Sequence, residues 1–187
     1  MTLSIVILNY KSEGLVRYCL SNILKSDLQI SYEIVVVDNA SPNSGVRNLK
    51  NEFSNVKFIE LKENRGFSAG NNAGIKVAKG KYIVIINPDI VVSPGSLEKL
   101  VDFMDNNPKV GCAGPKLMNP DGTVQNSCLR FPIGIMPFYR RSPLGKTKKG
   151  QRYLRNYLMH DFDHNSNIPV DWLFGACIVV RKSAIDE

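Results

Sequence analysis

Aliphatic runs alternate with amphipathic segments over the first 117 residues of the chain. Five apolar runs predict buried strands: LSIVILNY, YEIVVVDNAS, VKFIEL, YIVIINPD and VGCAGPKL, which begin at residues 3, 32, 56, 82 and 110. The segments between the first runs carry apolar residues at helical spacing. The last of these helices is expected to have Ser93 as its N-cap, and the helix before it to be closed by Gly80.

This alternation indicates βαβ units and an α/β fold with a mostly parallel central sheet. The strands are apolar almost throughout, which predicts that helices cover both faces of the sheet. After Leu117 the rhythm is lost. The segment up to Asn167 is basic, aromatic and irregular, with one helix expected near Gln151 to Met159. IPVDWLFGACIVVRK (168–182) then returns to a strand-like pattern, and we predict a single domain over residues 1–187.

The composition is that of a soluble globular protein, because 43% of the 187 residues are hydrophobic and 22% are charged. No apolar run is long enough to span a membrane, and the N-terminal run is expected to be a strand and not a signal peptide. Four cysteines lie far apart, without a C-x-x-C pair: Cys19, Cys112, Cys128 and Cys177. This spacing is typical of a reduced, cytoplasmic protein with buried thiols.

Positive charge is concentrated in one segment. The net charge is +7, from 24 basic and 17 acidic residues. In residues 140–155, RRSPLGKTKKGQRYLR, nearly half of the residues are Lys or Arg and none is acidic. The segment is either a solvated loop or a surface for a phosphorylated partner or an anionic membrane. Nucleic acid is not an expected partner, because that would need the basic patch joined to stacking aromatics on an ordered face.

Polar residues follow the predicted strands at the place where ligands bind in parallel sheets, beyond the carboxyl ends of the strands. There the sequence has Asn9–Tyr10, Asp38–Asn39, Asn64–Arg65 and Asn87–Asp89. Asp38 either closes a turn or accepts hydrogen bonds from a nucleobase or ribose. Arg65 is either a surface side chain or a planar donor to a diphosphate.

Asp89 has the clearest chemical role among these residues. Pro88 has no N–H group to donate, so the strand is expected to end at Asn87 and to place Asp89 just past its carboxyl end. A carboxylate there can hold a divalent cation that bridges the two phosphates of a nucleotide. A simple turn carboxylate is the alternative.

Two features of the helix expected at 67–80 stay open. Gly66, Gly70 and Gly74 are spaced by four and line one helix face, which suits packing on the sheet or close approach to a ligand. Asn71 either is exposed on this helix or faces the site.

Five motifs, in this order, resemble the inverting family 2 glycosyltransferases: SIVILNY, IVVVDNASPNSG, NRGFSAGNNAGI, YIVIINPDIVV and VDWLFGACIVVRKSA. The rhamnosyltransferase-like branch, with its Asn-Pro-Asp version of the Asp-x-Asp motif, is the most similar. The motifs cover the chain except for about residues 125–165. The resemblance implies a Rossmann-like GT-A fold, a sugar donor linked to UDP or dTDP, and a divalent cation, Mg²⁺ or Mn²⁺. It also implies transfer with inversion to a glycan or lipid-linked acceptor of a cell-surface polysaccharide.

The resemblance implies roles for single residues on the donor side. Asp38 would bind the base of the nucleoside, in a pocket lined by Asn9 and Tyr10. Arg65 and Asn71 would lie near the diphosphate or the sugar. Residues 1–117 would form this donor-nucleotide half, and residues 118–187 the start of an acceptor half that includes the basic loop 140–155.

Asp89 would hold the metal ion and the ribose end of the donor. Asn87 stands where many relatives have aspartate, so metal binding would rest on Asp89. The acceptor side would include three further residues: Trp172, Gly175 and Ala176.

The general base of the family is a carboxylate beyond the Trp-x-x-Gly-Ala stretch. Asp171, Asp186 and Glu187 do not match its position, so we expect the base beyond Glu187. We therefore expect a C-terminally incomplete fold that binds the donor but transfers sugar poorly.

A peripheral membrane contact through residues 140–155 would place the protein at the inner face of the cytoplasmic membrane. Two other functions stay open. One is a non-catalytic module that binds nucleotides or carbohydrates. The other is a sugar nucleotidyltransferase, which should carry a glycine-rich loop after the first strand, where NYKSEG offers only Lys11 and one glycine.

Overall fold

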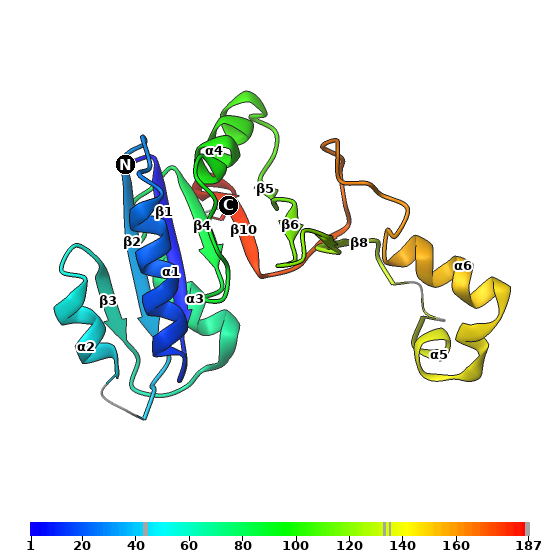
Figure 1. Cartoon of the computed structure of the whole chain (residues 1–187), viewed down its shortest axis with the longest axis horizontal. Coiled ribbons are helices and arrows are strands. Elements are labelled where there is room, and N and C mark those ends of the chain that lie inside the picture. Colours follow the sequence, from blue (N-terminus) through cyan, green and yellow to red (C-terminus); the bar gives the residue numbers. More distant parts are fainter. Residues whose placement is uncertain (43–44, 133, 135, 186–187) are drawn as a thin grey trace. The chain divides into compact units, whose positions relative to one another are not determined.

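A computed structural model describes residues 1–42, 45–132, 134 and 136–185 (Figure 1). The chain divides into two compact units, which are described one by one: Met1–Ala113 with Gly175–Glu187, and Gly114–Phe174. The expected division into a donor-nucleotide half and an acceptor half concerns function and stays a prediction. Among the described residues, no helix is long and apolar enough to cross a membrane.

The first unit contains a six-stranded sheet in the order β3-β2-β1-β4-β10-β5. Its strands are β1 (Leu3–Asn9), β2 (Tyr32–Asp38), β3 (Lys57–Glu60), β4 (Tyr82–Ile86), β5 (Cys112–Ala113) and β10 (Cys177–Arg181). The first four are parallel, and β10 runs antiparallel to β4 and β5. Asn9 pairs with Asp38, and Ile7 pairs with Ile86, so the carboxyl ends of β1, β2 and β4 lie at the same end of the sheet.

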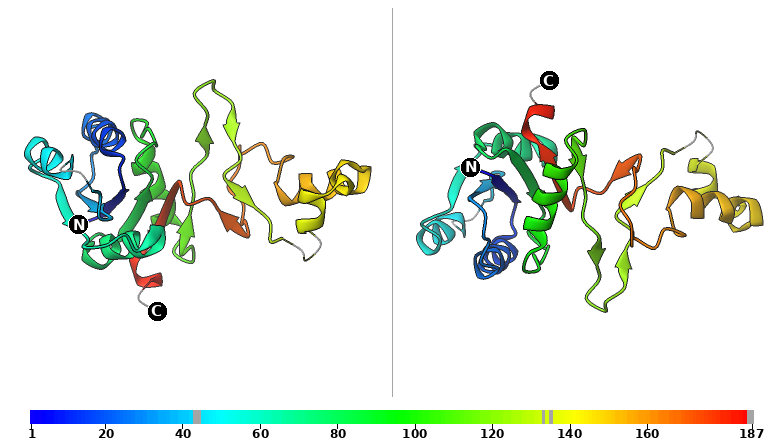
Figure 2. Two further views of the ribbon diagram at one scale, coloured as in Figure 1. Left: turned by 90° about the horizontal axis from the view of Figure 1, so that it is seen from below. Right: turned by 90° about the horizontal axis from the view of Figure 1, so that it is seen from above.

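Helices cover both faces of this sheet, as predicted (Figure 2). One face carries α1 (Glu13–Lys25), α2 (Gly45–Glu52) and α4 (Ser96–Asn106), and the other carries α3 (Gly66–Val77). A 3₁₀ helix, η2 (Lys182–Ala184), follows β10. The predicted α/β fold with a mostly parallel, doubly covered sheet is confirmed.

Two glycines let α3 approach the sheet closely. A Cβ atom on Gly70 would lie 2.4 Å from Leu8 Cδ1, and one on Gly74 would lie 2.5 Å from Val6 Cγ1. Real Cβ atoms do not approach so closely, so a larger residue at either position would force the Leu8 or Val6 side chain to shift. The structure therefore supports packing on the sheet as the reason for these two glycines.

Two predicted helix ends are wrong. The N-cap of α4 is Gly95, with φ 73°, and not Ser93, whose carbonyl oxygen instead accepts the N–H of Ser96 at 3.0 Å in a turn. The helix α3 ends at Val77, three residues before Gly80. Gly80 is needed for another reason, because its Cβ atom would lie 2.5 Å from the backbone nitrogen of Ser4.

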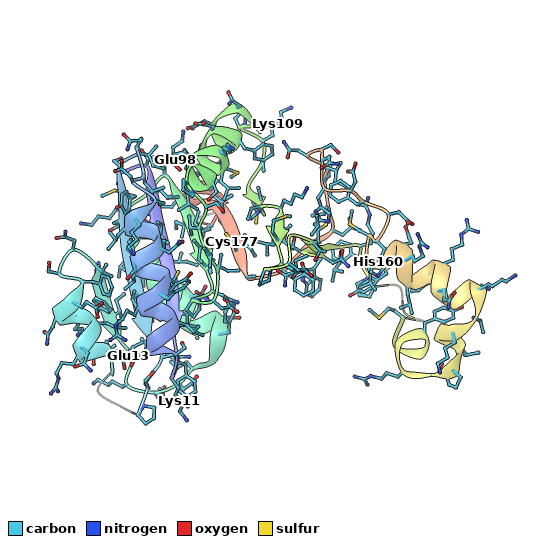
Figure 3. All side chains as sticks on the ribbon, in the orientation of Figure 1. Lys11, Glu13, Glu98, Lys109, His160 and Cys177 are labelled. Carbon is cyan, nitrogen blue, oxygen red and sulfur yellow. The ribbon has the colours of Figure 1, made fainter. Side chains whose placement is uncertain are left out.

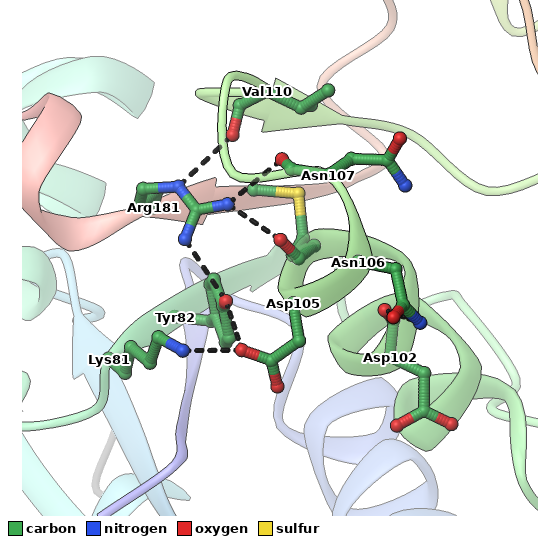
Figure 4. A network of polar contacts seen from close by, with 9 residues as sticks. Lys81, Tyr82, Asp102, Asp105, Asn106, Asn107, Val110 and Arg181 are labelled. Carbon is green, nitrogen blue, oxygen red and sulfur yellow. Dashed lines mark hydrogen bonds and ion pairs between the residues drawn. The ribbon is translucent and has the colours of Figure 1, made fainter.

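Arg181 ties β10, β4 and α4 together (Figure 4). Its guanidinium donates to the carbonyl oxygens of Met104 and Asn107 at 2.6 and 3.2 Å. It also donates to the Tyr82 hydroxyl at 3.1 Å, and that hydroxyl donates to Asp105 at 2.7 Å. Carbonyl groups in the last turn of a helix lack intrahelical partners, so Arg181 stabilises the end of α4 against the sheet.

The described residues of the second unit form two short ribbons and three helical segments. The strand β6 (Leu117–Met118) pairs with β7 (Val124–Gln125), and β8 (Cys128–Leu129) pairs with β9 (Trp172–Leu173). The helical segments are α5 (Met136–Arg141), η1 (Pro143–Lys146) and α6 (Lys148–Tyr157). The helix predicted near Gln151 to Met159 is confirmed as α6, although it begins three residues earlier because Thr147 Oγ1 caps it by accepting the N–H of Gly150 at 3.1 Å.

Candidate functional site

Asp38 and Asn9 meet at the carboxyl ends of β2 and β1. Both are buried, with 5% and 1% of their surface exposed. Asn9 Nδ2 donates to Asp38 Oδ1 at 2.7 Å. The N–H and hydroxyl of Ser41 donate to Asp38 Oδ2 at 3.0 Å and Oδ1 at 2.6 Å. The carboxylate thus makes turn contacts, while Oδ2 accepts one hydrogen bond from the residues that the structure describes.

Two serines that sequence reasoning missed complete this group. The N–H and hydroxyl of Ser12 donate to Asn9 Oδ1 at 3.2 and 3.0 Å. The Ser41 hydroxyl accepts the N–H of Lys11 at 3.0 Å, where φ of 57° turns the chain sharply after β1 (Figure 3). Serine is common in loops, so its presence at positions 12 and 41 gives no signal in the sequence. The two serines lie close together because Asn9 and Asp38, the residues that they contact, are paired across β1 and β2.

Asn39 fixes the turn that carries Arg65. Its buried amide donates through Nδ2 to Asn64 Oδ1 at 2.9 Å and to the Gly66 carbonyl at 3.2 Å. Its Oδ1 accepts the N–H of Arg65 at 3.2 Å. The guanidinium of Arg65 is exposed and lies 3.6 Å from the Glu63 carboxylate, an exposed ion pair of little strength. The backbone of Arg65 is therefore held while its side chain is available.

Tyr10 lies beside the same turn. Its phenol is exposed. A hydrogen bond with Asn64, and to a smaller extent one with Lys11, lowers the pKa of the phenol. The Lys11 ammonium lies 5.1 Å from the centroid of the ring. The structure thus brings an aromatic ring next to the Asn64–Arg65 turn.

Asn71 is buried in α3, with 4% exposed, so the interpretation as a surface residue is wrong. Its Nδ2 donates to the Phe67 carbonyl at 3.0 Å. Its Oδ1 has no hydrogen-bond partner in the part of the chain that the structure describes. A buried acceptor without a partner is costly, which makes this atom a candidate contact for a ligand.

Asp89 lies just past β4 with an exposed side chain. Main-chain pairing continues to Asn87, whose N–H donates to the Ala176 carbonyl at 2.9 Å, and stops before Pro88, as predicted. Within residues 1–42, 45–132, 134 and 136–185, the Asp89 carboxylate has no hydrogen bond or ion pair. Burial raises the pKa of the Cys19 thiol to about 12, with the charge of Asp89 as a second cause, so this carboxylate lies near α1.

Asp89 could hold a divalent cation if a bound ligand supplies further oxygen atoms to the same ion. The described residues hold no group of three or more His, Cys, Asp or Glu that could bind a metal ion. Mg²⁺-type sites often use one or two carboxylates and take their other oxygens from substrate phosphates and water. A free, exposed carboxylate suits such a site.

The predicted acceptor-side residues fall in both units. Gly175 and Ala176 precede β10 in the first unit, where a Cβ atom on Gly175 would lie 3.6 Å from the Phe67 ring. Gly175 therefore lies by the first turn of α3, the helix that carries Asn71. Trp172 belongs to the second unit, where it is 52% exposed in β9.

Asp171 is engaged in structural contacts, and the expectation that it is not the general base stays a prediction. It accepts the N–H of Phe131 at 3.0 Å and lies 3.9 Å from the guanidinium of Arg130. Asp186 and Glu187 lie outside the described residues.

The family model for "Glycosyl transferase family 2" matches residues 4–183. The N-acetylglucosaminyl-diphospho-decaprenol L-rhamnosyltransferase of Mycobacterium tuberculosis is 25% identical over 190 residues, which cover 91% of this chain and 58% of that protein. The poly(ribitol-phosphate) beta-glucosyltransferase of Bacillus spizizenii is 31% identical over 167 residues, which cover 79% of this chain and 26% of that protein. The chain thus spans less than two thirds of the length of these relatives.

Solved structures show the same fold. The mannosyltransferase PcManGT from Pyrobaculum calidifontis, in complex with GDP-Man and Mn²⁺, has a TM-score of 0.56 and 25% identity, over 64% of this chain and 36% of that chain. S. aureus TarS 1-349, in complex with UDP-GlcNAc, has a TM-score of 0.59 and 21% identity, over 73% and 42%. These likenesses confirm the expected GT-A fold.

Proposed function

Since the chain belongs to glycosyl transferase family 2, we propose that it binds a nucleotide-diphosphate sugar and serves transfer of that sugar, with inversion, to an acceptor. One observation carries the proposal: the buried Asn9–Asp38 pair ends β1 and β2, and the Asp89 carboxylate, which is unpaired among the described residues, follows β4 at the same end of the sheet. A nucleoside diphosphate offers the matching chemistry, because its base and ribose form hydrogen bonds and its two phosphates share a cation.

We assign each part of the nucleotide sugar to a residue by whether that residue donates or accepts hydrogen bonds. Asp38 Oδ2, an acceptor, suits an N–H group of the base or a ribose hydroxyl, with Asn9 holding the carboxylate and Tyr10 beside it. The Arg65 guanidinium, a planar donor, suits the diphosphate. The unpaired Asn71 Oδ1 cannot donate, so we assign it to a sugar hydroxyl and not to a phosphate oxygen.

Asp89 would hold Mg²⁺ or Mn²⁺ against both phosphates. When bound there, the cation would neutralise the charge that develops on the leaving nucleoside diphosphate. The acceptor oxygen forms a bond to the anomeric carbon from the face opposite the breaking bond to the phosphate oxygen, and a general base takes the acceptor proton. We assign that base to none of the described residues.

We propose a glycan or a lipid-linked saccharide as the acceptor, and UDP or dTDP as the nucleotide. The acceptor class is supported by the names of the two relatives, which act on a saccharide-diphospho-decaprenol and on poly(ribitol-phosphate). UDP is supported by the TarS complex with UDP-GlcNAc. Trp172, Gly175 and Ala176 are proposed to contact the acceptor, in a reaction at the inner face of the cytoplasmic membrane.

Calorimetric titration of UDP and dTDP, with and without Mn²⁺, tests the donor site. We expect metal-dependent binding of one nucleotide, weakened about 10- to 100-fold in Asp89→Asn, which keeps the shape of the side chain but loses its charge. Asp102→Asn is the matched control, because Asp102 is also exposed and its carboxylate has no hydrogen bond or ion pair among the described residues.

Binding that needs no metal, or that weakens equally in both variants, would contradict the role of Asp89. A non-catalytic binding module is distinguished by a second measurement. Nucleotide binding combined with no release of UDP or dTDP from any sugar donor, measured on the full-length protein, would favour the module over the transferase.

A further inference from the structure

We propose that one face of α6 binds the surface of an anionic phospholipid bilayer. The proposal deepens the membrane location given under the proposed function, because it names the helix face that makes the contact, but it requires neither a sugar donor nor sugar transfer. It depends on the second unit alone (Figure 1).

The exposed residues of α6 share one face of the helix. They are Lys148, Lys149, Gln151, Arg152, Arg155 and Asn156. Their spacing of i, i+1, i+3, i+4, i+7 and i+8 follows the 3.6-residue period. An open hollow of about 830 Å³ is lined by this face together with Tyr153 and Asp161.

The opposite face of α6 is held against η1 and α5. A Cβ atom on Gly150 would lie 2.2 Å from the Leu144 carbonyl oxygen and 3.0 Å from the Tyr139 ring. The rings of Tyr139 and Tyr153 pack with their centroids 5.2 Å apart. Because Gly150 permits this contact, the inner face is fixed and the basic face stays turned outward.

The positive charges of this face lack compensation within the described residues. Arg155 pairs with Asp161, but Lys148, Lys149 and Arg152 form no ion pair there. Lys148 and Arg152 are four residues apart, where like charges destabilise a helix. An anionic partner would remove this repulsion.

A bilayer fits this face better than a nucleic acid or a small anion. The ten residues of α6 span about 15 Å, so one diphosphate would contact only some of the four cations. Both tyrosines of α6 are half-buried, and the ring of Tyr153, which also lines the hollow, packs on the ring of Tyr139, so α6 offers no fully exposed ring on which bases could stack. Leu144, just before α6, is 54% exposed beside Lys146, and apolar residues next to cations are typical of segments that bind at a membrane interface.

Sedimentation of the whole chain with vesicles tests the proposal. The chain should bind vesicles that contain phosphatidylglycerol, and it should bind pure phosphatidylcholine vesicles far less. Each cation near an anionic bilayer strengthens binding about fivefold, so the triple variant Lys148→Gln, Lys149→Gln, Arg152→Gln should bind roughly 100-fold more weakly. The control is Lys76→Gln, Lys99→Gln, Lys109→Gln, which removes the same charge from exposed positions of the first unit that form no ion pair with the described residues (Figure 3 labels Lys109).

Loss in the first triple variant, with binding kept in the control, would support the proposal. Equal loss in both variants would overturn it, because net charge would then explain the binding. Tighter binding to single-stranded DNA than to vesicles, or release from vesicles by dilute inorganic diphosphate, would also overturn it, in favour of a nucleic acid or a small-anion site. The nucleotide affinity of the same variants should be unchanged. A failure of the membrane proposal can therefore be told apart from a failure of the proposed donor site.

Discussion

Asp38 combines a structural task with the proposed contact to the nucleoside. In Asp38→Ala, the buried Asn9 amide keeps only the Ser41 hydroxyl as an acceptor, at 3.3 Å, and half-buried Ser41 loses the acceptor of its N–H and its hydroxyl. Each buried donor left unpaired costs about 1–3 kcal/mol, so we expect the free energy of unfolding to fall by about 2–4 kcal/mol. Urea denaturation followed by circular dichroism measures this change, and nucleotide binding should be lost as well.

Comparing Asp38→Ala with Asp89→Asn separates an effect on stability from an effect on nucleotide binding. Asp89→Asn removes an exposed charge that is unpaired among the described residues, so it should change the unfolding free energy by less than about 0.5 kcal/mol while it weakens nucleotide binding. If Asp38→Ala destabilises the protein but leaves nucleotide affinity intact, Asp38 is a turn residue only.

The sequence reveals part of this site because residues that end parallel strands can be recognised from the pattern of apolar runs. Asn9, Asp38 and Asp89 were predicted in this way. Ser12 and Ser41 were not, because their hydrogen bonds depend on how two loops cross after β1 and β2. The burial of Asn71 was equally hidden, since the apolar pattern of α3 is weak beside its glycines.

Among the elements, α4 is stabilised at its C-terminal end by Arg181, a residue far away in the sequence. Replacement of Arg181 by Lys removes the planar group that reaches the Met104 and Asn107 carbonyls and the Tyr82 hydroxyl at once. We expect the free energy of unfolding to fall by about 2–4 kcal/mol, because at least two of these partly buried groups lose their donor. Differential scanning calorimetry measures the loss, with Lys99→Gln on the surface of α4 as a control.

Nucleotide affinity should be unchanged in Arg181→Lys at temperatures where the variant is folded. Arg181 pairs with Tyr82, the first residue of β4, whereas the candidate site follows the last residue of this strand. A loss of affinity in the folded variant would contradict the assignment of Arg181 to stability alone.

Element types were predictable from the sequence, and several element ends were not. The aliphatic runs and the helical spacing gave the correct alternation of strands and helices. Ser93 was wrong as an N-cap because Pro94–Gly95 forms a turn that delays the helix. Gly80 was wrong as a helix end because its small size serves a close contact with β1, which no local pattern reveals.

At the scale of the whole molecule, chain order and spatial order differ. The sequence loses its regular pattern after Leu117, whereas the first compact unit ends at Ala113 and resumes at Gly175. Strand β10 then enters the sheet between β4 and β5 with reversed direction. The strand itself could be predicted from its apolar residues, but its place and direction follow from long-range pairing that one sequence does not show.

This closing of the sheet by β10 makes the first unit sensitive to alkali. Cys19 of α1 and Cys177 of β10 are buried, and burial raises the pKa of each thiol to about 12, helped by Asp89 at Cys19 and by Cys19 at Cys177. In the unfolded chain a thiol titrates near 8.5. Above that pH the unfolded state binds fewer protons than the folded state, so stability falls as the pH rises.

The contribution of the two thiols is fully present below about pH 8.5 and is lost progressively as the pH rises toward about 12. The expected slope is about 1.4 kcal/mol per pH unit for each thiol. Urea unfolding in the presence of a reductant between about pH 8 and 10 measures it, below the range in which lysines titrate. The variant Cys19→Ala, Cys177→Ala should be less stable at neutral pH but should lose most of this slope. An equal slope in both proteins would mean that other groups cause the alkaline loss and that β10 does not bury its thiol against α1.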